Sequence, residues 1–437
     1  MATNLLTVDY WGTIVSILLA ILMLLIMVTI HEFGHYVAGK ILHFKINEFS
    51  VGFGPAIFKH KNKKTGELFA LRIIPLGGYC AFAGEDGLEE EDEKKPQEKS
   101  SQAEPFTEFK DKEEPAEPSA VEEAKGEQAE SKPAEVDKSG YFTNKKPWQR
   151  IIVLLAGAFM NYVLAVLLII ICFFSYGQTM IAVYHTEETQ DIPKEYCLQD
   201  RDIFYKINGK TIYLQTDIAQ AINGKKAGDK IELELSRIVS RETETDEDGN
   251  EVELSVTRER MTVEIILRSD VSVRNSAELD SVWAALGVKC NTGEGGVKTY
   301  DLANALSKFG FFETLGRSFA YSFKIAGSIF KVLGELLTGR IGISSLGGPI
   351  TTITTTAQVV SRGFRYFLEI SGFIGVNLAV FNLLPIPALD GSKVVFTVIE
   401  WIRGKPISRK VEAIIHAVGF ILLLGFAVLV DILQFVL

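Results

Sequence analysis

The stretch WGTIVSILLAILMLLIMVTIHEFGHYVAGK, Trp11 to Lys40, joins an apolar run without a single charge to two histidines and a glutamate. The run from Trp11 to Ile30 matches the roughly 20 apolar residues that a helix needs to cross a bilayer. The pattern H-E-x-x-H starts at the next residue, and on a helix its two histidines share one face. The stretch therefore predicts a membrane-spanning helix that ends in a candidate zinc site.

Three more apolar runs follow along the chain. Ile151 to Tyr176 and Ile370 to Leu389 carry no charge, and the only ionisable side chain in Ala413 to Val430 is His416. Four such runs are hard to bury in a soluble protein, so we expect an α-helical polytopic membrane protein with four transmembrane helices. The first run has no basic region before it and no small-residue cleavage site after it, so we expect no cleavable signal peptide. With their flanks, the expected helices cover residues 9–40, 146–177, 364–392 and 409–435.

Lysine and arginine gather in two of the loops and are absent before Trp11 and after Asp431. Because short basic loops stay on the cytosolic side of a membrane, we expect both termini outside. The H-E-x-x-H motif and the end of the third run then lie close to the cytosolic face. The loop residues behind this expectation are Lys40, Lys45, Lys59, Lys61, Lys63, Lys64, Lys145, Lys146, Arg150, Lys393, Arg403, Lys405, Arg409 and Lys410.

Two segments between the first two runs differ in composition. Residues 41–85 contain short strand-like stretches broken by Gly-Pro and Gly-Gly turns. They predict a small cytosolic β element associated with the membrane. Residues 86–140 are acidic: from Glu85 to Gly140 the chain holds 20 acidic and 8 basic residues and five prolines. Such a segment cannot bury a core, so we expect a disordered cytosolic insertion that acts as a spacer.

Residues 178–291 predict a β-rich outer domain inserted between the second and third helices. The pieces DIFYKINGKTI, TDIAQAINGK, DKIELELSRIV and RMTVEIILRS combine strands with a short helix, and Asn208-Gly209 is a hairpin-type turn. This arrangement resembles a single PDZ domain, expected on the extracytoplasmic side. Sequence alone leaves open whether Cys197 and Cys290 form a disulfide there.

Residues 300–345 are apolar but carry Arg317, Lys324 and Lys331 at seven-residue spacing. On a helix these three side chains form one stripe, which predicts amphipathic juxtamembrane helices. A fifth span would reverse the last two helices and place the basic loop 393–410 outside, against the orientation above.

The H-E-x-x-H motif supplies part of a catalytic zinc site. His31 and His35 are one helical turn apart and can bind one zinc ion, and Glu32 can take a proton from the attacking water. A zinc site needs a third protein ligand. The position ten residues after His31 is Ile41, which excludes one common arrangement.

Three carboxylates compete for the place of third ligand. Glu48 and Glu67 lie in the turn-rich segment, without a following helix to present them. Asp390, in NLLPIPALDGSK at the inner end of the third run, is the better candidate because orientation places it at the depth of His31. A helix cap before Gly391 is the structural alternative for Asp390.

The prolines near Asp390 predict a break in the third helix. Pro385 and Pro387 free backbone groups that membrane burial tolerates only beside protein or a watery cavity. Asn382 can donate and accept hydrogen bonds there, and Asn377 lies nearby, although either can serve as a contact between helices.

Two sequence motifs on different helices indicate a family resemblance. H-E-F-G-H on a first transmembrane helix and N-x-x-P-x-P-x-L-D-G on a later one resemble the site-2 protease family of intramembrane zinc metalloproteases. The subgroup with a PDZ insertion, which includes the bacterial regulator-of-sigma-E protease, is most similar. The second helix of this family usually reads G-P-x-x-N, and here Gly157 and Asn161 keep that pattern with Ala158 in place of the proline.

The resemblance implies one Zn²⁺ ion bound by His31, His35 and Asp390, with Glu32 as general base. It further implies that Asn382 holds substrate or the developing oxyanion, and that the segment Ile73–Phe82 offers a β edge to an unwound substrate. The PDZ domain would admit membrane proteins whose outer part has been trimmed. The expected substrate-binding residues are Asn382, Pro385, Pro387, Gly77, Gly78 and Tyr79.

The expected function is therefore that of a zinc metalloendopeptidase of the bacterial plasma membrane. Its partners would be the lipid bilayer and single-span membrane proteins such as anti-sigma factors or remnant signal peptides, with no nucleic acid. A zinc-dependent scaffold without proteolysis is the alternative, although a purely structural site has no need of Glu32. A transporter would predict paired repeats, which the sequence lacks.

Overall fold

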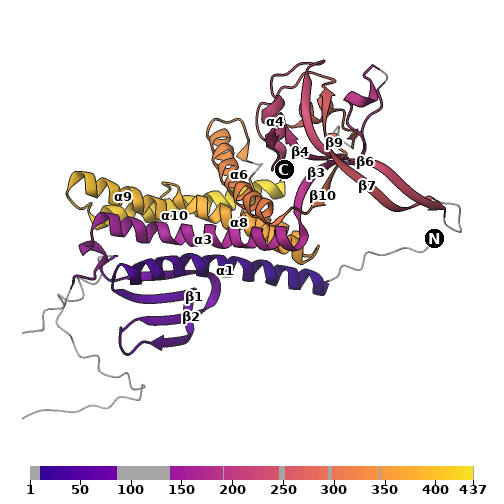
Figure 1. Cartoon of the computed structure of the whole chain (residues 1–437). Helices are drawn as coiled ribbons and strands as arrows, with labels where there is room; N and C mark the ends of the chain where they lie inside the picture. The colour runs from indigo at the N-terminus through magenta and orange to yellow at the C-terminus, as the bar shows by residue number, and fades with distance from the viewer. Residues whose placement is uncertain are drawn as a thin grey trace, which may run out of the picture.

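The computed structural model describes residues 10–85, 138–189, 191–245, 251–293, 298–343 and 346–436. Within these ranges the chain forms a bundle of long helices with two β-rich parts attached (Figure 1). The predicted acidic insertion, 86–140, lies outside the described residues except for its last three positions.

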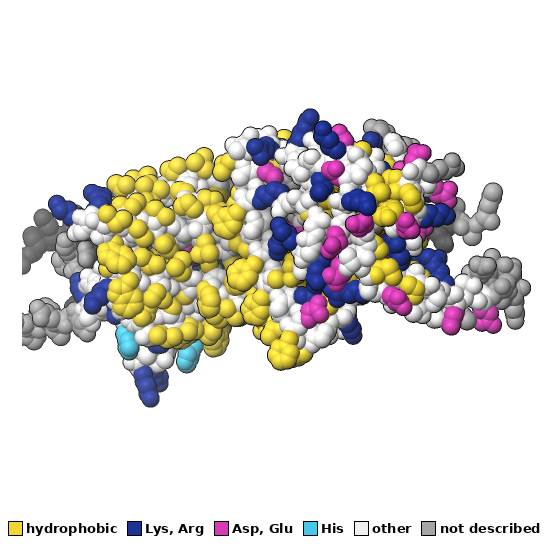
Figure 2. Space-filling model, turned by 45° about the horizontal axis from the view of Figure 1, so that its top comes forward, with side chains coloured by type: hydrophobic (Ala, Val, Ile, Leu, Met, Phe, Trp, Pro, Cys, Tyr) yellow, Lys and Arg dark blue, Asp and Glu magenta, His cyan; other side chains and the backbone are white. Residues whose placement is uncertain are grey.

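Four helices in the described residues are long and apolar enough to cross a membrane, as predicted. They run side by side along the bundle, and α3 packs against both α1 and α8 (Figure 1). Figure 2 shows apolar side chains covering the helical part, while charged side chains gather over the β-rich part at the other end. These helices are α1 (Tyr10–Ile41), α3 (Pro147–Tyr176), α8 (Phe364–Leu383) and α10 (Arg409–Val436).

The third apolar run does not stay helical up to its aspartate. α8 ends at Leu383, and the chain continues without helical structure until α9 (Asp390–Arg403) begins. Pro385 and Pro387 explain this end, because proline lacks the N–H that a helix interior requires. Asp390 is thus the first residue of a new helix, which packs against the start of α3.

A buried ion pair fastens α9 to α3. The guanidinium of Arg150 donates to Glu400 Oε2 at 2.7 Å, and both side chains are almost fully buried. Burial alone would raise the pKa of the Glu400 carboxyl, but the N–H of Ile407 and the Arg150 charge together lower it. Glu400 therefore stays ionised, and the pair holds the helix that begins with Asp390.

The small β element consists of β1 (Ile46–Lys61) and β2 (Leu68–Phe82), which pair antiparallel beside α1 (Figure 1). Both strands bend sharply, so the first half of β1 pairs with both halves of β2. Gly52 and Gly77 lie at these bends with φ of +85° and +121°, a region that other residues rarely adopt. Phe58 and Ile73 are among the apolar side chains that the element leaves exposed.

The larger β-rich part is a six-stranded antiparallel sheet in the order β10-β3-β4-β6-β7, with β5 paired to β4. Its core includes Phe204, Leu235 and Trp283. The sheet begins at residue 178 and takes in β10, beyond the range 178–291, because β10 pairs with β3. The elements of this β-rich part are β3 (Gln178–Val183), β4 (Ile203–Ile207), β5 (Lys210–Thr211), α4 (Gln215–Ile222), β6 (Lys230–Thr245), β7 (Glu251–Ile266), α5 (Asp280–Leu286), β8 (Cys290–Thr292), β9 (Lys298–Tyr300) and β10 (Leu302–Ser307). β8 and β9 pair with each other in a separate two-stranded sheet. Cys197 and Cys290 are free thiols.

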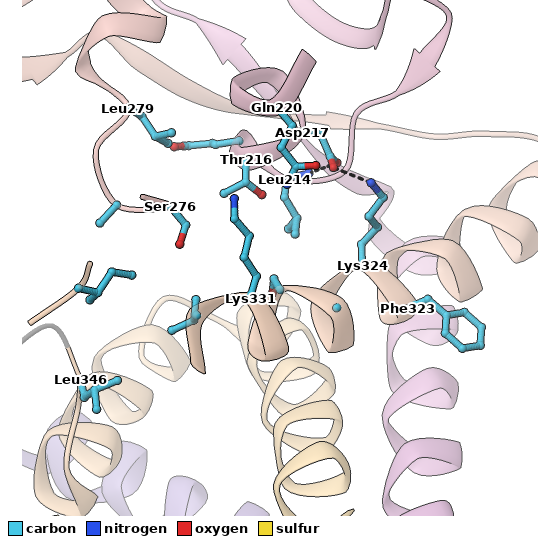
Figure 3. Close-up of a pocket in the computed structure, with 16 residues that line it drawn as sticks. Leu214, Thr216, Asp217, Gln220, Ser276, Leu279, Phe323, Lys324, Lys331 and Leu346 are labelled. Atoms are coloured by element: carbon cyan, nitrogen blue, oxygen red, sulfur yellow. Dashed lines mark hydrogen bonds and ion pairs between the residues drawn. The ribbon is translucent and has the colours of Figure 1, made fainter. Parts of the chain in front are cut away.

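One amphipathic helix, α6 (Phe311–Leu337), lies between the bundle and this sheet (Figure 1). Its predicted basic stripe faces the β-rich part. Arg317 Nε donates to Gln178 Oε1 at 2.6 Å, and Lys324 Nζ donates to Asp217 Oδ1 at 2.7 Å. Figure 3 shows the second contact at the edge of a cavity of about 570 Å³ between α4 and α6. A shorter helix, α7 (Pro349–Val360), packs on α1.

Candidate metal centre

Three ligand atoms from two distant parts of the chain meet at one point. α1 presents His31 and His35 on one face, and the start of α9 brings Asp390 against them. Asp390 Oδ2 lies 2.8 Å from His31 Nε2 and 3.2 Å from His35 Nε2, and the two imidazole nitrogens are 3.1 Å apart. Both histidines are buried.

This arrangement fits a zinc ion. Zinc takes two imidazole nitrogens and a carboxylate oxygen at about 2.0–2.2 Å, which places tetrahedral ligand atoms about 3.3 Å apart. Among the described residues these three form the group of potential metal ligands that converges in this way. Three protein ligands leave the fourth position of a tetrahedral ion open for water or substrate.

The two other carboxylates that the sequence offered are engaged elsewhere. Glu48 accepts from the guanidinium of Arg72 at 2.6 Å, and Glu67 forms an ion pair with Lys40. Neither belongs to the converging group.

The second ring nitrogen of His35 has a partner that would suit a metal ligand. Its Nδ1 lies 2.8 Å from the carbonyl oxygen of Val153 on α3, so Nδ1–H donates to that oxygen. Nε2 is then the unprotonated nitrogen and faces Asp390 and His31. Such a hydrogen bond behind a ligand fixes both its tautomer and its ring plane.

His31 is held by two asparagine amides. The amide nitrogens of Asn161 and Asn382 lie 3.4 and 3.3 Å from its Nδ1. With metal on Nε2, Nδ1 keeps its proton and needs an oxygen acceptor, which an amide supplies when its Oδ1 faces the ring. Asn161 Oδ1 is buried without a hydrogen-bond partner, so a half-turn of this amide satisfies both groups.

Asn161 and Gly157 are site residues that the sequence pattern did not assign to the metal centre. A Cβ atom on Gly157 would lie 2.5 Å from His35 Nε2 and 2.7 Å from His31 Nε2, so only glycine lets α3 approach. The G-x-x-x-N spacing on the second helix was the available signal. Asn377 lies away from the centre and donates to the carbonyl of Phe373 at 2.8 Å.

Glu32 faces a cavity of about 310 Å³ beside the three ligand atoms. Tyr79 and Cys80 of β2 and Asp390 also line this cavity. A Cβ atom on Gly78 would lie 3.3 Å from Glu32 Cγ, so the predicted base lies directly beside β2. Burial raises the pKa of the Cys80 thiol, which keeps it protonated and unsuited to act as a nucleophile.

The remaining predicted substrate-binding residues have different surroundings. The hydroxyl of Tyr79 accepts from Arg72 at 2.9 Å, and Gly77 is pressed against the ring of Phe53. Pro385 and Pro387 lie in the turn between α8 and α9. Neither proline is among the described residues that line the cavity beside Glu32.

The candidate centre lies inside the bundle, well away from the end of α3 at Pro147. It contacts α3 at Gly157, ten residues after Pro147, where that helix begins. At 1.5 Å per residue this is a depth of about 15 Å along the helix axis.

Comparisons with known proteins cover nearly the whole chain. The family model described as peptidase family M50 matches residues 19–426. A protein named zinc metalloprotease RasP from Geobacillus kaustophilus is 28% identical over 446 residues, which cover 94% of this chain and 96% of the relative. A protein of the same name from Oceanobacillus iheyensis is 27% identical over 439 residues, covering 92% and 95%.

Proposed function

Because the chain belongs to peptidase family M50 and is a multi-pass bacterial membrane zinc metalloprotease, we propose that it cleaves single-span membrane proteins within their transmembrane segments. The observation that carries this proposal is the depth of the candidate centre. Three convergent side chains that could bind zinc lie about 15 Å along a helix that is long enough to span a bilayer. A peptide bond that reaches them lies at membrane depth.

We assign His31, His35 and Asp390 as the zinc ligands and Glu32 as the general base. Bound zinc supplies Lewis acidity, which polarises the scissile carbonyl and the attacking water. Glu32 takes a proton from that water and later gives it to the leaving amine nitrogen. Asn382, within 3.3 Å of His31 Nδ1, is assigned to orient that ligand from α8 as well as to meet the substrate.

The substrate strand is proposed to pair with the edge of β2. The segment 78–82 pairs with β1 on one side, and in the described residues no strand pairs with its other side. Glu32 and the cavity lie next to this segment at Gly78 and Tyr79. A substrate helix must unwind before it can be cut, which exposes its backbone N–H and C=O groups. Pairing with this strand edge would give those groups hydrogen-bond partners.

The proposed orientation has both termini and the β-rich part from β3 to β10 outside the cell. α1 begins and α10 ends at the end of the bundle that carries this sheet (Figure 1), and the basic loops lie at the opposite end. We propose that the sheet with α4 is a PDZ-like domain that restricts access to membrane proteins with a trimmed outer part. Anti-sigma factors and remnant signal peptides are the proposed substrate types.

The ligand assignment predicts that Asp390→Asn loses both zinc and activity. An amide is a far weaker ligand than a carboxylate, so we expect zinc affinity to fall more than about 100-fold, beyond the effect typical of outer-shell partners. Zinc per chain and cleavage of a reconstituted single-span substrate are measured together. Asp191→Asn, at an exposed position of the outer part, is the matched control. Normal zinc content in Asp390→Asn would remove Asp390 from the ligand set.

The acidic segment is predicted to be dispensable for catalysis. Excision of residues 88–138 is expected to leave the cleavage rate of a single-span substrate within about twofold of wild type, because a solvated spacer contributes no contact to the site. The rate is measured at equal amounts of folded protein. If the excised protein loses activity and the intact chain restores it, the segment has a role in substrate handling.

A further inference from the structure

The fourth membrane helix contains a polar side chain that the proposed mechanism does not use. His416 is the only ionisable residue in the apolar run from Ala413 to Val430. Ionisable groups at membrane depth are costly and tend to have a specific partner. Most of α10 is exposed on the bundle surface, so the contacts that it does make are informative.

The partner of His416 is the backbone of the loop that presents Asp390. The N–H of Ala388 donates to His416 Nδ1 at 3.0 Å. The imidazole is therefore neutral and carries its proton on Nε2. Phe396 of α9 packs edge-on against the ring, with centroids 5.6 Å apart, and holds its plane.

Ala388 adopts a conformation that needs such support. Its φ is +79°, in the left-handed region that residues with a Cβ rarely adopt. A strained residue of this kind persists where its surroundings over-determine it. Because Ala388 precedes Asp390 by two residues, its conformation sets the direction from which the Asp390 carboxylate enters the metal centre.

A second contact on the same face of α10 receives the loop. A Cβ atom on Gly419, three residues after His416, would lie 2.2 Å from Pro387 Cβ. His416 and Gly419 thus form a shallow socket on α10 in which Pro387 and Ala388 lie.

Two cavities border the loop and the residues beside it. Asp390 faces the cavity of about 310 Å³ that Glu32 lines. Ala388 and His416 border another cavity, of about 580 Å³. Asp390 and Ala388 thus each border open space, so close packing does not hold the loop on those sides.

We propose that His416 is a positioning residue for the metal centre: by accepting the Ala388 N–H, it holds the 384–389 loop, with Ala388 in its left-handed conformation, so that Asp390 points at His31 and His35. This inference rests on the proposed role of Asp390 as a ligand. It makes α10 part of the metal site although α10 contributes no ligand atom.

The test compares two substitutions at position 416 in the full-length protein. His416→Ala removes the acceptor, and we expect zinc affinity and cleavage rate each to fall about 10- to 100-fold. His416→Asn retains an acceptor of similar reach and is expected to stay within about threefold of wild type. Zinc affinity is measured by competition with a chromophoric chelator, and cleavage with a reconstituted single-span substrate. Leu422→Ala, on the exposed face of α10, controls for loss of apolar surface.

A suppressor variant separates positioning from general stability. Glycine adopts positive φ without strain, so Ala388→Gly in the His416→Ala background is expected to recover most of the lost zinc affinity. Gly419→Ala keeps the imidazole but pushes a methyl group at Pro387, and should lower zinc affinity as His416→Ala does.

The outcomes discriminate between the two proposals. Wild-type zinc affinity in both His416→Ala and Gly419→Ala overturns the positioning role, as does a His416→Asn variant that is as impaired as His416→Ala. If Asp390→Asn itself retains zinc, the ligand assignment fails first. Loss of zinc in Asp390→Asn together with unchanged His416 variants refutes this inference alone.

Discussion

Replacing Glu32 by glutamine is expected to slow cleavage of a single-span substrate about a thousandfold while zinc remains bound. Glutamine has the size of glutamate but cannot accept the proton of the attacking water, and a positioned base contributes roughly 10²- to 10⁴-fold to a rate. Glu32 is not one of the three convergent ligands, so the donor set for the metal is unchanged. The measurement pairs initial cleavage rates in reconstituted vesicles with zinc content per chain.

Glu188→Gln, at an exposed position of the larger β-rich part, is the control for the same chemical change elsewhere. Wild-type cleavage by Glu32→Gln would disprove the role of general base. Loss of zinc together with activity would instead indicate that Glu32 supports the metal. Normal zinc with lost cleavage also separates a protease from a zinc-dependent scaffold, because a scaffold has no step that requires this carboxylate.

Gly157→Ala is expected to abolish both zinc binding and cleavage. The added methyl group would lie 2.5 Å from His35 Nε2 and 2.7 Å from His31 Nε2, in the space that a shared metal ion needs. Alanine favours a helix over glycine by about 1 kcal/mol, so α3 itself should not be weakened. Zinc content, cleavage rate and thermal unfolding are measured on the same preparation.

The matched control is Gly425→Ala in α10, where a Cβ atom meets nothing within 4 Å. This variant carries the same chemical change in a second membrane helix and should retain zinc and activity. If Gly157→Ala still binds zinc with wild-type affinity, the metal does not lie between the two imidazoles and α3.

The helical part of the fold could be predicted because its signal is local. The four predicted spans are confirmed as four long apolar helices, although the third ends at Leu383. They could be predicted because the bilayer imposes length and composition on each span separately. The end of α8 near Leu383 could also be predicted from a local signal, because Pro385 and Pro387 cannot continue a helix. The family assignment rested on motifs within these helices.

Features that depend on which helix or strand faces contact each other could not be predicted from the sequence. Gly157 and Asn161 lie at the candidate metal centre only because α3 packs against α1 at that level. The basic stripe of α6 predicted an amphipathic juxtamembrane helix, but it could not show that Arg317 contacts Gln178 in the β-rich part. The inclusion of β10 in the sheet likewise depends on long-range pairing with β3.

The depth of the candidate centre has a consequence for the two fragments that a cut produces. α3 has 30 residues, about 45 Å, so a hydrocarbon layer of about 30 Å centred on it leaves roughly 7 Å at each end. A bond cut at the level of Gly157 then lies only about 8 Å inside the inner boundary. In the proposed orientation the inner fragment keeps about one and a half helical turns of apolar chain, too few to anchor it, whereas the outer fragment keeps enough to remain embedded. Cleavage would thus act as a one-way release into the cytosol.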